Sequence, residues 1–155
     1  MNPEERIVKR WTDTFFARYP IKPINEIIEY VREATTKIFN EVIKGYYGKK
    51  SNLEVDDALD DLMRFLASDV NLSPADSIRL IGNLKYIIAD EMKLNSDERL
   101  KLFEVIDEVI YKAFDYYMKC REKIFELRLK EKDREVEIMR KILECASRAM
   151  RNSKP

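Results

Sequence analysis

Residues Phe114–Glu131 read FDYYMKCREKIFELRLKE and lie inside a run, Asn83–Lys154, that contains neither glycine nor proline. Asn95, followed three residues later by Glu98, has the form of a helix start in which each side chain serves the other's free backbone N–H. Nothing from there to Met150 predicts a helix end, and a helix of that length measures about 80 Å. A compact chain of this size has a radius of gyration of about 15 Å. The predicted helix must therefore break or leave the globule.

The character of this predicted helix changes twice along its length. Its first part, Leu102–Leu127, carries apolar residues at steps of three and four and is expected to lie against a core. Residues 130–135 read KEKDRE, which is charged on every side, so they form either solvated helix or a hinge. We therefore predict a helical domain over residues 1–129, followed by a charged hinge and an amphipathic helix over residues 130–155.

An amphipathic stripe runs along the last segment. Its residues follow each other at steps of three and four: Val136, Met139, Leu143, Ala146 and Met150. A lone helix of about 15 residues is marginal in water, so this stripe needs a partner. That partner is a second subunit, the protein's own domain or another protein. We expect a two-fold homodimer, the commonest oligomer; the rival is a helical hairpin bent at residues 130–135.

The same dimer is expected to use the end of the preceding apolar seam, at Tyr117, Cys120, Ile124 and Leu127. Cys120 has two readings there. It is a small apolar interface residue, since cysteine is among the most buried residue types, or a redox-sensing thiol that is modified or paired with its mate across the two-fold axis. The second cysteine, Cys145, is about 25 residues further along the same predicted helix, too distant for a disulfide within a straight helix.

Four shorter helices are predicted before the long one. Capping side chains and prolines predict their starts at Asn2, Pro23, Asn52 and Ser73. Trp11, Phe15 and Phe16 fall at helical spacing in the first of them, which is more typical of a core than of an aromatic ligand box. Gly82, inside the fourth helix, is expected to let another helix cross closely.

An acidic cluster opens the third predicted helix and consists of Asp56, Asp57, Asp60 and Asp61. Its functional reading is a site for a cation or a basic partner. Its plainer reading is a solvated helix start, because acidic residues are favourable near a helix N-terminus. Without the spacing of a calcium loop we favour the plainer reading.

Histidine is absent from all 155 residues. This removes the usual general base at physiological pH, the commonest metal ligand and the normal proximal ligand of haem. Nucleophile pairs of the Ser–His and Cys–His kinds are impossible as well. We therefore expect a protein that is not an enzyme and that holds no metal and no cofactor.

Charge and hydropathy restrict the surroundings in which this protein works. Lysine plus arginine equal aspartate plus glutamate at 29 each, so no net field draws the chain to nucleic acid. No apolar run approaches the roughly 18 residues of a membrane span, and no N-terminal segment predicts export. We expect a cytoplasmic protein with reduced thiols. Charged residues make up 37%, weighted to Glu and Lys, a pattern found in thermophile proteins.

Three stretches resemble a known family. They are REATTKIFNEVIKGYYG (Arg32–Gly48), LSPADSIRLIGNLKYII (Leu72–Ile88) and FDYYMKCREKIFELRLKE (Phe114–Glu131). They resemble the N-terminal domain of the RsbR-type stressosome co-antagonists, most closely the short, stand-alone members called RsbRD N-terminal domain proteins. The resemblance covers roughly Glu5 to Arg134, and its third stretch is the most specific.

What the resemblance implies is a globin-like helical fold without haem, dimeric, that senses a signal. In longer relatives the last helix continues into a linker and an output domain. Here only five residues follow Met150, so the output is expected to lie in a regulatory partner protein. Two functions follow. The first is a sensory or regulatory domain that acts through homodimerisation and protein contact, with an unknown small-molecule ligand. The alternative is an adaptor that binds one partner complex through its C-terminal helix without sensing a ligand.

Overall fold

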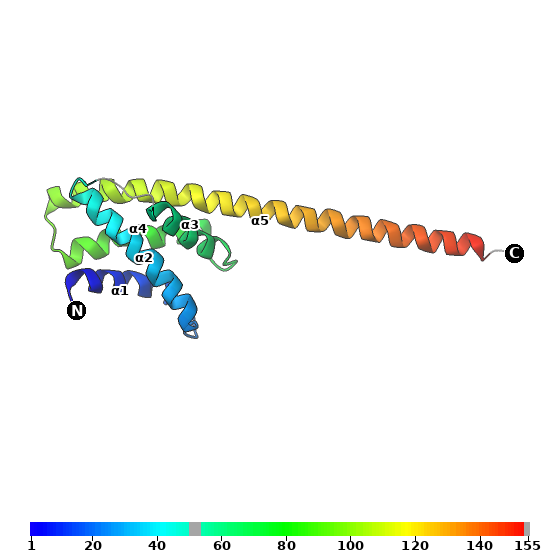
Figure 1. Ribbon diagram of the computed structural model, residues 1–155, viewed down its shortest axis with the longest axis horizontal. Helices are drawn as coiled ribbons and strands as arrows, with labels where there is room; N and C mark the ends of the chain where they lie inside the picture. The colour runs from blue at the N-terminus through cyan, green and yellow to red at the C-terminus, as the bar shows by residue number, and fades with distance from the viewer. Residues whose placement is uncertain (50–53, 154–155) are drawn as a thin grey trace. The chain divides into compact units, whose positions relative to one another are not determined.

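The computed structural model describes residues 1–49 and 54–153, and every regular element in these ranges is a helix (Figure 1). The helices are α1 (Pro3–Phe16), α2 (Asn25–Tyr46), α3 (Glu54–Ala67), α4 (Pro74–Glu91) and α5 (Ser96–Asn152). The predicted all-α fold with a long last helix is confirmed. The predicted start of the third helix at Asn52 lies outside the described residues.

Three of the predicted helix starts are present with their hydrogen bonds. At α1 the Asn2 side chain accepts from the Glu5 backbone N–H at 2.8 Å, and the Glu5 carboxylate accepts from the Asn2 N–H at 3.2 Å. Asn95 and Glu98 make the same reciprocal pair at α5, at 2.9 and 3.1 Å. At α4 the Ser73 hydroxyl accepts from the N–H of Asp76 at 3.0 Å. Local sequence therefore fixes where these helices begin.

Two compact units make up the chain, Met1–Cys120 and Arg121–Pro155. The boundary lies inside α5 and earlier than the position predicted at residues 129–130. The reason is that side chains of α5 pack against the core only as far as Cys120. Ile124 and Leu127 continue the apolar pattern beyond that residue.

Helix α5 itself is unbroken from Ser96 to Asn152. Residues 130–135 are helical and exposed, which is the solvated helix of the two predicted alternatives. The structure has neither the predicted hinge nor a helical hairpin bent at these residues. A charged segment with no apolar face still satisfies all its backbone hydrogen bonds as helix, so charge alone does not break it.

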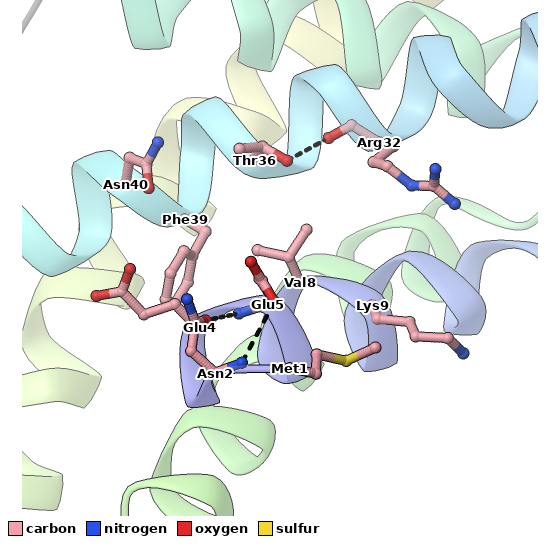
Figure 2. Close-up of a pocket in the computed structure, with 10 residues that line it drawn as sticks. All are labelled: Met1, Asn2, Glu4, Glu5, Val8, Lys9, Arg32, Thr36, Phe39 and Asn40. Atoms are coloured by element: carbon pink, nitrogen blue, oxygen red, sulfur yellow. Dashed lines mark hydrogen bonds between the residues drawn. The ribbon is translucent and has the colours of Figure 1, made fainter.

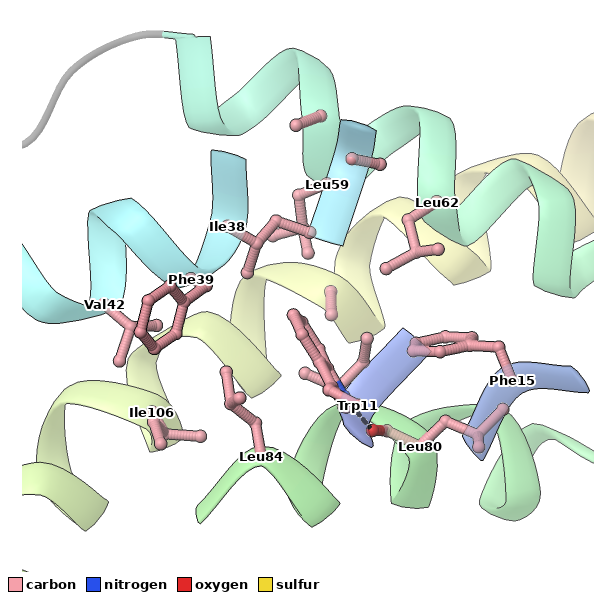
Figure 3. Packing of buried hydrophobic residues seen from close by; sticks show 14 of the residues in the cluster. Trp11, Phe15, Ile38, Phe39, Val42, Leu59, Leu62, Leu80, Leu84 and Ile106 are labelled. Atoms are coloured by element: carbon pink, nitrogen blue, oxygen red, sulfur yellow. Dashed lines mark hydrogen bonds between the residues drawn. The ribbon is translucent and has the colours of Figure 1, made fainter. Parts of the chain in front are cut away.

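The core of the first unit is built around Trp11 (Figure 3). Its side chain is fully buried, and its indole N–H donates to the Leu80 carbonyl at 2.8 Å, which joins α1 to α4. The ring of Phe15 meets it edge to face at 5.7 Å between centroids. Phe16 packs against the same core from a half-buried position. The aromatic cluster therefore belongs to the core, as its helical spacing predicts.

Hydrogen bonds and ion pairs also join the helices of the first unit. The hydroxyls of Thr12 on α1 and Thr35 on α2 lie 3.0 Å apart in the interior. At the surface, Arg10 donates to the carboxylates of Asp90 at 2.9 Å and Glu91 at 2.8 Å, which joins α1 to the end of α4. The buried hydroxyl pair satisfies two groups that would otherwise be costly to bury.

The close helix crossing is made by a different glycine from the one predicted. A Cβ added to Gly82 would meet its nearest neighbour, Ile110 Cδ1, at 3.9 Å, an ordinary contact. At Gly45 of α2 a Cβ would lie 3.0 Å from Val105 Cγ1 of α5. The expectation for Gly82 is therefore wrong, and Gly45 is the position where the absence of a side chain matters.

Apolar residues beyond the helix ends lie outside the core. Val70 is 75% exposed, because α3 ends at Ala67 and the helical spacing does not continue to it. Ile24 is 63% exposed for the corresponding reason, since it precedes the first residue of α2. Periodicity predicts a shared face only while the chain remains helical.

Candidate functional site

Two surface features are candidates for function, and each lies within one unit. The first is a pocket between α1 and α2 with a volume of about 550 Å³ (Figure 2). That volume falls within the range of small-molecule sites in proteins. Val8 of α1 and Phe39 of α2 line the space between the two helices with apolar side chains, Val8 half-buried and Phe39 only 1% exposed.

Charged and polar side chains surround that apolar surface. Lys9 forms an ion pair with Asp13 at 3.0 Å, and Arg32 forms one with Glu29 at 2.7 Å. The Thr36 hydroxyl donates to the Arg32 carbonyl at 2.7 Å. The arrangement suits a small molecule with an apolar body and a polar edge, because the side chains at the rim carry both signs of charge.

A second pocket of about 470 Å³ lies on the other side of Phe39 and shares Asn2 and Glu4 with the first. Its far wall includes Glu91. Hydrogen bonds from Arg10 and Arg6 hold the pKa of the Glu91 carboxyl below its ordinary value of 4.5. These ion pairs fix the end of α4 against α1 and so define that wall.

The second feature is the predicted stripe on α5. Val136, Met139, Leu143 and Met150 are all at least 60% exposed, and Ala146 between them is exposed as well. Large apolar side chains gathered on one face mark an interaction site in a soluble protein. Among the described residues of Arg121–Pro155 none is buried, so this unit has no interior of its own.

The residues predicted for the dimer interface lie in different surroundings. Tyr117 is fully buried in the core of the first unit and leaves no surface for a second chain. Cys120 and Ile124 are half-buried, and Leu127 is exposed. The prediction of a dimer contact therefore remains for these three and not for Tyr117. Burial of Tyr117 follows from its spacing of four from Ala113, which also lies in the core.

Sequence reasoning missed two exposed apolar residues, Phe125 and Leu129. The signal for them was present. Counting back by sevens from Val136 reaches Leu129, and counting back by sevens from Met139 reaches Lys132 and then Phe125. The apolar residues predicted to face the core, which end at Leu127, lie on a different face of the same helix. Their pattern overlaps residues 125–129 in the sequence, so the second pattern was not recognised.

Two residues of the predicted acidic cluster form ion pairs. Asp60 pairs with Arg64 at 2.9 Å, and Asp56 lies 3.6 Å from the Lys112 ammonium. Across residues 1–49 and 54–153, no group of three or more histidine, cysteine, aspartate or glutamate side chains could hold a metal ion. Both cysteines are free thiols, Cys120 half-buried and Cys145 exposed. A separate point concerns membranes. In the same described part of the chain, no helix combines the length and hydropathy needed to cross a bilayer.

Fold and surface together define an all-helical protein whose second unit is a single helix with an exposed apolar stripe. The chain is similar to an uncharacterized protein of Archaeoglobus fulgidus, 46% identical over 146 residues that cover 94% of this chain and 95% of that protein. It belongs to the family of this archaeal protein. An archaeal relative is compatible with the predicted thermophile character. No family model and no solved structure matches the chain.

A further similarity is to the RNA-directed RNA polymerase L of Andes orthohantavirus. It amounts to 28% identity over 126 residues, which cover 76% of this chain. The matched segment is 6% of the polymerase, so this chain spans only a small part of that protein.

Proposed function

We propose that this protein is a non-enzymatic sensory or regulatory domain that acts through homodimerisation and protein–protein contact. The observation that carries the proposal is the apolar stripe on the second unit, from Val136 to Met150, which is exposed in the single chain. Its apolar side chains gain free energy only when another surface covers them. A second copy supplies that surface without any further protein.

The sensory part of the proposal rests on the pocket between α1 and α2. Its volume of about 550 Å³ and its apolar surface at Val8 and Phe39 suit a small molecule rather than a single ion. The resemblance of Arg32–Gly48, Leu72–Ile88 and Phe114–Glu131 to RsbR-type N-terminal domains supports the same reading. Under this proposal the protein works in the cytoplasm, where its two free thiols stay reduced.

The alternative function is an adaptor that binds one partner complex through its C-terminal helix and senses no ligand. The same exposed stripe favours it, because a stripe of Val136, Met139 and Leu143 fits an apolar groove on another protein as well as it fits a second copy. The two functions differ at the α1–α2 pocket, which only the sensor needs to fill.

Native mass spectrometry of the full-length protein, purified without denaturation, separates these readings. A dimer that carries a bound small molecule supports the sensor, and Thr36→Trp, which would fill the pocket from a half-buried position on its wall, should then lose the molecule while Tyr111→Ala, on an exposed side chain outside the pocket, should keep it. An empty pocket contradicts the sensor, and a monomer with an empty pocket supports the adaptor, because its stripe is then left for another protein. A monomer at micromolar concentration contradicts homodimerisation in either form.

A further inference from the structure

We infer that the second unit pairs with the same segment of a second copy as a parallel, in-register, two-stranded coiled coil over residues 125–150. This inference rests on the proposed homodimer and adds its orientation and its register. Its starting point is the exposed apolar face of α5, which repeats with a period of seven residues rather than drifting around the helix. A sustained seven-residue period is the pattern that makes two helices wind around each other.

Two sets of residues form the repeat. The first set is Leu129, Val136, Leu143 and Met150, and the second set is Phe125, Lys132, Met139 and Ala146. All eight are exposed in the single chain. They alternate at steps of four and three over about four heptads, the length at which such a repeat becomes diagnostic of a coiled coil. We call these eight residues the heptad seam. Cys120 and Ile124 precede it, and Leu127 lies on the opposite side of the helix from Leu129, so this inference moves the dimer contact away from those three residues.

Charges beside the heptad seam select the parallel orientation. In a parallel coiled coil, the residue before a first-set position faces the residue five places later on the other chain. Two of these pairs lie within residues 125–150 and are charged on both sides, and each joins opposite charges: Arg128 with Asp133, and Glu135 with Arg140. Every pair occurs twice in a symmetric dimer, so the parallel arrangement gains all of them together.

An antiparallel pairing that overlaps the whole segment forms half as many of these charge pairs. It would place Val136 of one chain against Met139 of the other, and the flanking positions would then meet in a different combination. Asp133 would face Arg140, but Arg128 would meet Ala149 and Glu135 would meet Ile142. Charge complementarity therefore favours a parallel second copy, since the charges at flanking positions set the orientation of coiled coils.

Lys132 is the one charged residue in the heptad seam. Its side chain is 78% exposed, and its ammonium lies 3.8 Å from the Glu135 carboxylate of its own chain. The long stem can cover apolar neighbours while the ammonium stays in water. In the parallel dimer it also lies beside Asp133 of the second copy. A single lysine in such a seam lowers the stability of the coil.

In the dimer, two ion pairs of the single chain, Arg140–Glu137 and Lys132–Glu135, gain a neighbour of opposite charge from the second copy. In the single chain Arg140 donates to Glu137 at 2.6 Å. In the dimer it would lie between Glu137 of its own chain and Glu135 of the second copy. Exposed ion pairs contribute little to stability, so this change is not a barrier to association.

Disulfide trapping in the full-length chain tests orientation and register. Leu129→Cys is introduced together with Cys120→Ser and Cys145→Ser. In the parallel dimer the two introduced thiols face each other, so mild oxidation should link nearly all chains. In the antiparallel dimer they would be about 25 Å apart and could not link. The matched control is Lys130→Cys, which lies on the outer side of the coil and should not link.

A mixture of two variants provides the opposite test. Chains with Leu129→Cys and chains with Ala146→Cys, in the same background, should form only links within each kind if the pairing is parallel. A mixed disulfide between the two kinds would show the antiparallel arrangement and overturn the inference. A dimer in which neither variant links would also overturn it while leaving the proposed homodimer in place, whereas a monomeric protein would remove both.

Charge reversal supplies a measurement that does not depend on cysteine. Arg128→Glu should raise the dissociation constant of the dimer about tenfold, since it replaces two attractive pairs by two repulsive ones. Adding Asp133→Arg should restore most of the affinity, because the pair is then reversed but again opposite in sign. The matched control is Lys130→Glu, whose effect should be much smaller. If the double variant is weaker than Arg128→Glu alone, these residues do not face each other and the inference fails.

Discussion

The two units of this chain carry the same apolar periodicity with opposite outcomes. In the first unit Leu102, Ile106 and Ala113 of α5 are separated by four and seven residues and are fully buried against the other helices. In the second unit Val136, Met139 and Leu143 follow the same helical spacing along the same helix and are exposed. Amphipathic spacing therefore predicts that one face of a helix is apolar. Whether other helices of the same chain bury that face depends on the rest of the sequence.

Truncation of a core leucine should produce the largest effect and sharpen this contrast. Leu84 is fully buried in the first unit, so Leu84→Ala should lower the free energy of unfolding by about 2–5 kcal/mol through lost burial and a residual cavity. Leu143→Ala in the second unit should leave the unfolding of the first unit within about 0.5 kcal/mol of the wild type. Urea unfolding followed by the fluorescence of Trp11, the single tryptophan, measures the first unit alone.

The two helical glycines give the next effect. Gly45→Ala should destabilise the first unit by about 1–2 kcal/mol, because the new Cβ would meet Val105, whose branched side chain has little freedom to move in a helix. Gly82→Ala has room and should stabilise it by about 0.5–1 kcal/mol through helix propensity. Thermal and urea unfolding measure both. Equal effects of the two substitutions would show that α2 and α5 do not approach as closely as the structure has them.

A smaller change is expected at Tyr117. Its hydroxyl is buried and has no hydrogen-bond partner among the described residues. Tyr117→Phe removes this unpaired group and should raise the free energy of unfolding by about 1 kcal/mol. The matched control is Tyr19→Phe, which removes a hydroxyl that donates to Asp69 at 2.7 Å and should not stabilise. A loss of stability in Tyr117→Phe would mean that the hydroxyl is paired in solution.

The smallest effect concerns pH and the ion pairs between α1 and α4. The folded pKa of Glu91 is lowered by Arg10 and Arg6, so the stability this group contributes is present above its ordinary pKa of 4.5 and is lost as the pH falls through the lowered value. Glu91→Gln should therefore flatten the decline of the first unit's stability below about pH 4.5. Urea unfolding of both forms across the acid range, starting from neutral pH, measures this. An unchanged pH profile would contradict the lowered pKa.

Much of the fold could be predicted because it depends on local signals. The caps at Asn2, Ser73 and Asn95 and the helical spacing of Trp11 and Phe15 are read directly from neighbouring residues. The positions that failed depend on contacts between distant residues. Which glycine lies under a crossing helix is decided by Val105, which is 60 residues further along the chain than Gly45.

The candidate sites also differ in whether they depend on local or on distant residues. The stripe from Val136 to Met150 could be predicted because it lies on one helix. The α1–α2 pocket could not, since it arises only when Val8 and Phe39 are brought together from two helices. Tyr117 was assigned to an interface because sequence shows that a face is apolar and does not show whether the covering surface belongs to the same chain.

Static light scattering of two chains tests the central claim most directly, that the exposed stripe is covered by a second copy. Full-length protein and a form lacking residues 136–155 are compared at tens of micromolar. We expect the full-length protein at twice the 18.5 kDa mass of one chain, and we expect the shortened form to dissociate to monomers. A full-length protein that remains monomeric, or a shortened form that dimerises with unchanged affinity, would contradict the account.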